Sequence, residues 1–285
     1  MAELQYALIV EWIGFFCVLA ILSPLVPSKR WRYYACYVCY VTVLSLFAII
    51  LCPIIALRPR NIVNLKMSAF CLRPFTKIIG IDWELRNGQF LKEDRGAVIC
   101  ANHQSIFDIM GMFNIWDVMD KCTAVARKEL LYVIPFGPMA WMCGLVFIDR
   151  VDPKGANVKL SAASRIINSL KAKFWLFPEG TRNKKAADLL PFKRGAFKIA
   201  IEAQVPIIPI VYSPYYFINS KAKSFGHGKI IISVLDSIST KGLTLEDIDS
   251  LRFKTHEIMS EEYNKLKDEI SRSQNNNLHC DKSLS

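Results

Sequence analysis

The sequence lacks the marks of four common catalytic and nucleotide-binding sites. It has no Gly-x-Ser-x-Gly elbow, His-Glu-x-x-His zinc helix, Walker A loop or Gly-x-Gly-x-x-Gly turn. Hydrolases of the elbow type, zinc proteases, P-loop nucleotidases and Rossmann dinucleotide enzymes therefore lose their usual signatures. We find no internal repeat. Function must be read from another set of residues.

Acidic residues are in the minority, with 25 Asp and Glu against 36 Lys and Arg. Such an excess suggests an anionic partner: nucleic acid, a membrane surface or a phosphorylated substrate. The chain carries no nucleic-acid-binding motif, so we expect no nucleic-acid partner. The nine cysteines do not predict a disulfide framework, because their number is odd and several lie inside apolar runs.

Charged residues are almost absent from two N-terminal runs. Leu4–Val26 contains only Glu11, and Tyr33–Leu57 contains none. Each run is long enough to cross a bilayer, and no basic residue precedes the first as it would in a cleaved signal peptide. We predict that residues 1–64 form a hydrophobic helical membrane anchor, with the lipid bilayer as a partner.

The topology of this anchor stays open. Basic residues follow both runs, and the positive-inside rule places both flanks in the cytosol. Two complete crossings would separate those flanks. Either the second run dips into the membrane and returns, or the runs form a hairpin whose loop charges reach an interface.

Beyond residue 65 short apolar segments alternate with helical patterns. This order predicts an α/β domain over 65–270, built on a mostly parallel sheet flanked by helices. The Asn run in 271–285 predicts a disordered tail. The expected strands are 83–86, 97–101, 123–126, 145–148, 174–177, 206–211 and 230–235, and the expected helices are 158–170, 192–203 and 243–270.

A histidine and an aspartate follow the strand 97–101, in the segment Asn102–Asp108. We expect a helix over the apolar positions after His103, with Asp108 about one turn into it. His103 and Asp108 meet only if His103 lies in the preceding loop and folds back. Asp108 then holds one imidazole nitrogen while the other faces a substrate. The alternative is a surface histidine capping a helix beside an unrelated aspartate.

Two further strand ends carry polar groups: Asp149–Arg150 and Glu179–Arg182. Carboxyl ends of parallel strands share one edge, so these groups should converge on one cleft. Arginine suits phosphate because its planar fork donates two hydrogen bonds. Gly180 permits close backbone approach, and Glu179 is expected to hold an arginine, either in a structural ion pair or within the substrate site.

Four segments in this order resemble the four motifs of the PlsC-type glycerolipid acyltransferases, specifically the 1-acyl-sn-glycerol-3-phosphate acyltransferases. The first is Asn102-His103 with Asp108, the family's NHxxxxD motif. The other three are Gly144–Arg150, Phe177–Arg182 and Val205–Ile210. The wider resemblance runs from the membrane segments to about Ile210.

This resemblance implies an endoplasmic-reticulum membrane enzyme with a cytosolic catalytic domain. It would transfer an acyl chain from acyl-coenzyme A to lysophosphatidic acid, giving phosphatidic acid, with no metal and no cofactor beyond the co-substrate. His103 would be the general base and Asp108 would orient it. Backbone N–H groups at the helix start would stabilise the oxyanion. The acceptor would be bound by Arg150, Glu179, Gly180, Thr181 and Arg182.

Other readings remain. The acceptor can be glycerol 3-phosphate or another lysophospholipid. A membrane-bound hydrolase would use His103 with water or Ser105, and a binding protein without catalysis is disfavoured by the His/Asp pair. Lys193 and Arg194 either bind coenzyme A phosphates or simply begin a basic helix. The sequence does not indicate acyl-chain preference or oligomeric state.

Overall fold

The structure is a computed structural model. It describes residues 28–149, 166–183 and 187–283, with Val18, Leu22, Leu25 and Ser164, and it describes side chains as far as Gln274. The predicted first apolar run and most of the predicted helix 158–170 lie outside these residues.

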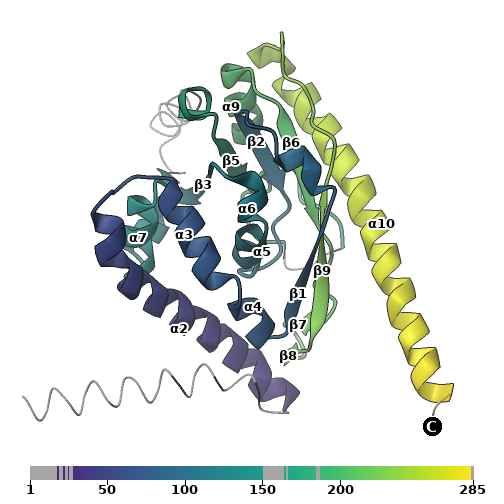
Figure 1. Cartoon of the computed structure of the whole chain (residues 1–285). Helices are drawn as coiled ribbons and strands as arrows, with labels where there is room; N and C mark the ends of the chain where they lie inside the picture. The colour runs from purple at the N-terminus through teal and green to yellow at the C-terminus, as the bar shows by residue number, and fades with distance from the viewer. Residues whose placement is uncertain are drawn as a thin grey trace, which may run out of the picture.

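A seven-stranded sheet forms the centre of the molecule (Figure 1), in the order β1-β9-β6-β2-β5-β3-β4. Every pairing is parallel except β6 with β9. The predicted α/β fold with a mostly parallel sheet is confirmed. The strands are β1 (Ile81–Arg86), β2 (Ala97–Ala101), β3 (Cys122–Arg127), β4 (Val146–Ile148), β5 (Lys173–Leu176), β6 (Ile207–Tyr212) and β9 (Gly228–Val234).

Alternate residues of each central strand enter two different cores. In β2, Ile99 packs into one core and Val98 into the other, as the two-residue period of a strand requires. Burial on both faces explains why these strands are continuously apolar. The first core is covered by α2 (Lys29–Ala56), α3 (Val63–Leu72), α5 (Asp108–Asn114) and α6 (Trp116–Met119), and the second by α9 (Gly195–Ala203) and α10 (Ile248–Ser283).

Shorter elements complete the chain. A two-stranded sheet, β7 with β8, contacts α2. Residues 133–135 separate η3 from α7, whose first turn contains Pro138. These elements are α4 (Phe75–Ile78), η2 (Gly88–Leu91), η3 (Lys128–Tyr132), α7 (Phe136–Met142), β7 (Ile218–Asn219), β8 (Ser224–Phe225) and η4 (Leu245–Asp247).

Among the described residues, α2 alone is long and apolar enough to cross a membrane. One side of it packs against α3, α7 and β8, and its buried Tyr40 shares a core with Phe107. The predicted boundary at residue 64 therefore does not separate two cores. The other side of α2 is exposed and apolar, and it carries Tyr34, Val38, Val41, Ile49, Ile50 and Ile54.

The helix predicted over 243–270 is present as η4 followed by α10, which begins after a capping box between Thr244 and Asp247. In the structure α10 continues through residues 271–283; the disordered tail stays a prediction. Adding a residue to an existing helix costs far less than nucleating one, so the helix extends into the Asn run. In Figure 1, α10 and α2 lie on opposite sides of the sheet.

Candidate active site

The loop after β2 is tied to the neighbouring strand β6 by Asn102. The buried Asn102 side chain donates from Nδ2 to the carbonyl of Tyr212 at 3.0 Å and accepts at Oδ1 from the N–H of Tyr212 at 2.7 Å. Gln104 adds bonds from Nε2 to the carbonyls of Tyr212 and Ser213. The chain on either side of His103 is thus held against β6.

His103 and Asp108 are in direct contact, as predicted. The imidazole Nδ1 lies 2.7 Å from Oδ2 of Asp108, whose side chain is fully buried. An ionised carboxylate only accepts hydrogen bonds, so it holds the proton on Nδ1 and leaves Nε2 as a lone-pair base. The imidazole is partly open, with 18% of its side chain exposed.

Helix α5 begins at Asp108 and not a turn earlier, which corrects the expected helix start. The reason lies in the same carboxylate. Oδ2 also accepts the backbone N–H groups of Gln104 at 2.7 Å and Ser105 at 2.9 Å, so the loop curls around it. Those two N–H groups of the loop are therefore bonded to Asp108, and stabilisation of an oxyanion by N–H groups at the helix start stays a prediction.

Tyr215 completes the environment of Asp108, and sequence reasoning missed it. Its hydroxyl donates to Oδ1 of Asp108 at 2.8 Å. Burial and the Asp108 charge raise the pKa of Tyr215 well above its ordinary value, so the phenol stays a donor. The available signal was a tyrosine three residues after β6, a strand that neighbours β2.

The imidazole also rests on the loop after β5. It stacks on Phe177, with ring centres 4.0 Å apart and planes 18° apart. The His103 backbone N–H donates to Oε1 of Glu179 at 2.8 Å, and its carbonyl accepts from the N–H of Asn183 at 2.7 Å. His103 is therefore fixed through its ring and through both sides of its peptide.

Glu179 makes different contacts from those expected. Its carboxylate accepts the backbone N–H groups of His103 and Leu190, and no arginine of the described chain pairs with it. The side chain is 2% exposed. Burial raises its pKa to about 7, against the lowering effect of the two N–H donors. Within the described structure, Glu179 holds the backbone of the loop that carries His103.

The rest of this turn faces outward. Gly180 has φ of +73°, which favours glycine, and its carbonyl accepts from Nη2 of Arg127 at 3.0 Å. Thr181 and Arg182 are exposed. The Arg182 guanidinium interacts electrostatically with Tyr37 and Tyr40 of α2, which places it on the side of the site that α2 covers.

Helix α2 also touches the catalytic loop. The hydroxyl of Tyr40 donates to the carbonyl of Ile106 at 3.1 Å, and its ring packs against Phe107. The apolar N-terminal helix therefore forms part of the wall beside His103.

The other predicted residues are less closely placed. Arg150 lies outside the described residues, and its neighbour Asp149 pairs with Lys128 at 3.0 Å. Strand β4 is separated from β2 by β3 and β5. Of the three strand ends that were predicted to converge, those of β2 and β5 are therefore adjacent, and that of β4 is not. Exposed Arg194 pairs with Asp249 at 3.6 Å.

A metal centre and a serine nucleophile are two further kinds of site on which the described residues bear. The described part of the chain holds no group of three His, Cys, Asp or Glu side chains suited to a metal ion. The hydroxyl of Ser105 accepts the N–H of Phe107, and the described contacts include no bond from it to His103.

Comparisons with known proteins agree on one family. Residues 82–213 match the Acyltransferase family. Human 1-acyl-sn-glycerol-3-phosphate acyltransferase beta is 38% identical over 201 residues, 70% of this chain and 71% of that protein. The Haemophilus influenzae 1-acyl-sn-glycerol-3-phosphate acyltransferase is 30% identical over 239 residues, 81% and 98% of the two chains. The crystal structure of the Thermotoga maritima 1-acyl-sn-glycerophosphate acyltransferase PlsC shares the fold, with TM-score 0.57, 19% identity and coverage of 94% and 99%.

Glu179→Gln should make stability less dependent on pH. The folded protein holds the Glu179 proton more tightly than the unfolded chain, since its pKa rises from 4.5 to about 7. That contribution is fully present below about pH 4.5 and is lost as pH rises through 7. The free energy of unfolding of the variant relative to the wild type should therefore rise between pH 5 and 8, by about 3 kcal/mol at most, and its melting temperature should rise with it.

The comparison is a set of melting curves of both proteins in detergent. Glu257→Gln, an exposed glutamate of α10, serves as the matched control and should follow the wild type. Parallel curves for wild type and Glu179→Gln would show that Glu179 does not titrate in this range.

Proposed function

The chain belongs to the acyltransferase family that contains the 1-acyl-sn-glycerol-3-phosphate acyltransferases, and we propose that it acylates lysophosphatidic acid to phosphatidic acid with acyl-coenzyme A as donor. The observation that carries this proposal is the 2.7 Å contact between His103 and the buried Asp108. It leaves a positioned base in a partly open site.

In this reaction Nε2 of His103 removes the proton of the sn-2 hydroxyl as its oxygen attacks the thioester carbonyl carbon. The C–O bond forms, the C–S bond breaks, and the departing thiolate takes the proton back from the imidazolium. Asp108 stabilises the imidazolium and keeps Nδ1 protonated. A base held in this way typically contributes about 10² to 10⁴ in rate.

Arg182 is proposed to bind the acceptor's phosphate, together with Arg150, Gly180 and Thr181. Its exposure, and its position on the side of His103 that α2 covers, support the assignment. A guanidinium offers two parallel donors to phosphate oxygens. Glu179 serves this site indirectly, by holding the backbone of His103.

The enzyme is proposed to reside in the endoplasmic-reticulum membrane with its catalytic domain on the cytosolic side. The exposed side of α2 is apolar, and exposed basic residues flank it at Lys29 and Arg30 and at Arg58 and Arg60. Because α2 lies along the domain, both flanks can stay on one side of the bilayer if the helix is embedded and does not cross. This arrangement favours the re-entrant alternative for the second apolar run.

His103→Ala and Asp108→Asn should each lower acyl transfer by at least about tenfold, and by up to 10⁴, because each removes the oriented base. The assay measures phosphatidic acid formed by membranes carrying each variant, with acyl-coenzyme A and a panel of acceptors. His227→Ala, an exposed histidine, is the control.

The same assay separates the alternatives. Faster acyl transfer to glycerol 3-phosphate or to another lysophospholipid than to lysophosphatidic acid would show that the proposed acceptor is wrong. Free fatty acid released without acceptor would indicate a hydrolase. A fully active His103→Ala protein would show that His103 is not the general base.

Arg182→Ala should weaken use of lysophosphatidic acid by about one to two decades in kcat/KM while acyl-coenzyme A kinetics change little. A lost charge-assisted hydrogen bond costs about 1.5–3 kcal/mol. Arg182→Lys should rescue poorly, because an ammonium lacks the two-pronged geometry. Arg272→Ala, on exposed α10, is the matched control. Equal impairment of both substrates with a lowered melting temperature would instead assign Arg182 a structural role.

Cysteines introduced at Lys29 and Arg60 should both react with a membrane-impermeant maleimide in sealed microsomes, because both ends of α2 are expected on the cytosolic face. The parent protein provides the background from native cysteines. Protection of either position until detergent is added would show that α2 crosses the membrane.

A further inference from the structure

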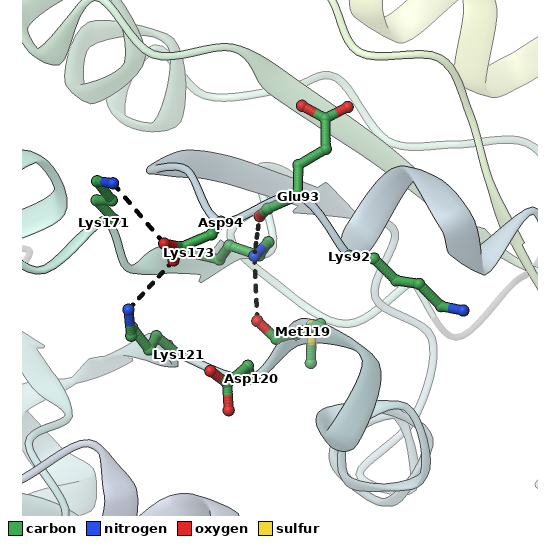
Figure 2. Close-up of a pocket in the computed structure, with 8 residues that line it drawn as sticks. All are labelled: Lys92, Glu93, Asp94, Met119, Asp120, Lys121, Lys171 and Lys173. Atoms are coloured by element: carbon green, nitrogen blue, oxygen red, sulfur yellow. Dashed lines mark hydrogen bonds and ion pairs between the residues drawn. The ribbon is translucent and has the colours of Figure 1, made fainter.

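A cavity of about 260 Å³ opens at the amino-terminal edge of the sheet. It lies between the segment before β2, the turn from α6 to β3 and the start of β5. These strands are parallel, so the cavity and the catalytic loop occupy opposite edges. Figure 2 shows the residues that line it: Lys92, Glu93, Asp94, Met119, Asp120, Lys121, Lys171 and Lys173.

Lys173 lies at the centre of this cavity and is 3% exposed. Its ammonium donates to the carbonyls of Glu93 at 2.9 Å and Met119 at 3.1 Å. An ammonium has three N–H donors, and the contacts of the described residues supply no third acceptor and no carboxylate at ion-pair distance. A buried charge is costly: burial lowers the pKa of Lys173, and the nearby carboxylates of Asp120 and Asp94 offset that effect only in part.

Lysines also converge at the mouth of the cavity. Lys121 and Lys171 both pair with the exposed Asp94, at 3.1 Å and 3.7 Å (Figure 2). Two ammonium groups are therefore already placed to hold one anionic group. Lys92 lies at the opposite rim with no ion-pair partner among the described residues.

The other two acidic side chains of the lining form their ion pairs with cations outside it. Glu93 pairs with Arg95 at 2.7 Å, and Asp120 pairs with Lys66 at 2.7 Å. Neither Arg95 nor Lys66 belongs to the lining. Four lysines and three acidic residues therefore line the cavity, and among the described ion pairs Asp94 is the one lining carboxylate that pairs with lining lysines.

We propose that this cavity binds a soluble phosphate-class anion, inorganic phosphate or a phosphomonoester, at a site separate from acyl transfer. A tetrahedral anion with several acceptor oxygens can accept a hydrogen bond from the third N–H of the Lys173 ammonium and can contact Lys121 and Lys171 at the same time. Lysines bind phosphate as flexible point charges and suit such a cluster. The cavity lies at the sheet edge opposite the loop of Ile106 that α2 contacts, which favours a soluble anion over a lipid headgroup.

Phosphate titration of the full-length protein in detergent tests the site. At constant ionic strength, the melting temperature followed by tryptophan fluorescence should begin to rise once phosphate approaches the Kd of the site, and should then climb with the logarithm of the phosphate concentration. Lys121→Gln/Lys171→Gln should weaken the apparent affinity by about tenfold or more. Both side chains are exposed, so this variant should fold, whereas replacing Lys173 also removes two structural bonds.

Two control variants show whether the response to phosphate comes from this cavity. Lys254→Gln/Lys265→Gln removes the same charge from exposed α10 positions and should leave the response unchanged. Arg182→Ala should also leave it unchanged, because Arg182 lies at the other edge of the sheet.

Each of four results would overturn the proposal: no phosphate-specific rise, equal loss in both double variants, loss in Arg182→Ala, or a response to phosphatidate in mixed micelles but not to phosphate. The third would assign phosphate binding to the catalytic edge, and the fourth would make the cavity a lipid-headgroup site.

Discussion

The buried carboxylate of Asp108 is the group on which the geometry of the catalytic loop depends. A charge with no solvent exposure is costly unless hydrogen bonds replace its water. Here the replacement comes from the ring of His103, two backbone N–H groups and the hydroxyl of Tyr215. The loop must curl to supply them, and that curl places the imidazole over the sheet edge with Nε2 available.

The neighbouring strands keep this loop from relaxing. Asn102 fastens it to β6, while Glu179 and Asn183 fasten the His103 peptide to the loop after β5. The three strands belong to one parallel set, so their carboxyl ends lie together without further structure. Rigid strands therefore orient a histidine that itself lies in a loop, which is the usual division between scaffold and site.

Much of this arrangement could be predicted from the sequence, because it follows from local patterns. Apolar runs bounded by polar residues predicted the strands, and the offset between His103 and Asp108 predicted that the loop folds back. The role of Glu179 could not be predicted, because a carboxylate beside an arginine-containing turn suggests an ion pair. The actual partners of Glu179 are backbone N–H groups, whose positions are known only from the structure. Tyr215 escaped for a related reason: its partner is 107 positions away in the chain. The start of α5 was misplaced because apolar periodicity does not report a loop organised around a buried charge.

The contact between Tyr40 and Ile106 has a consequence for how the N-terminal helix relates to the rest of the protein. A membrane tether that only holds an enzyme near its lipid can be exchanged for any other tether. Here the same helix packs against Phe107 and closes one side of the catalytic loop. Transplanting the domain onto a foreign helix, or truncating it after α2, would remove these contacts to the loop that carries His103. The N-terminal helix is therefore part of the packing of the domain and not a separable module.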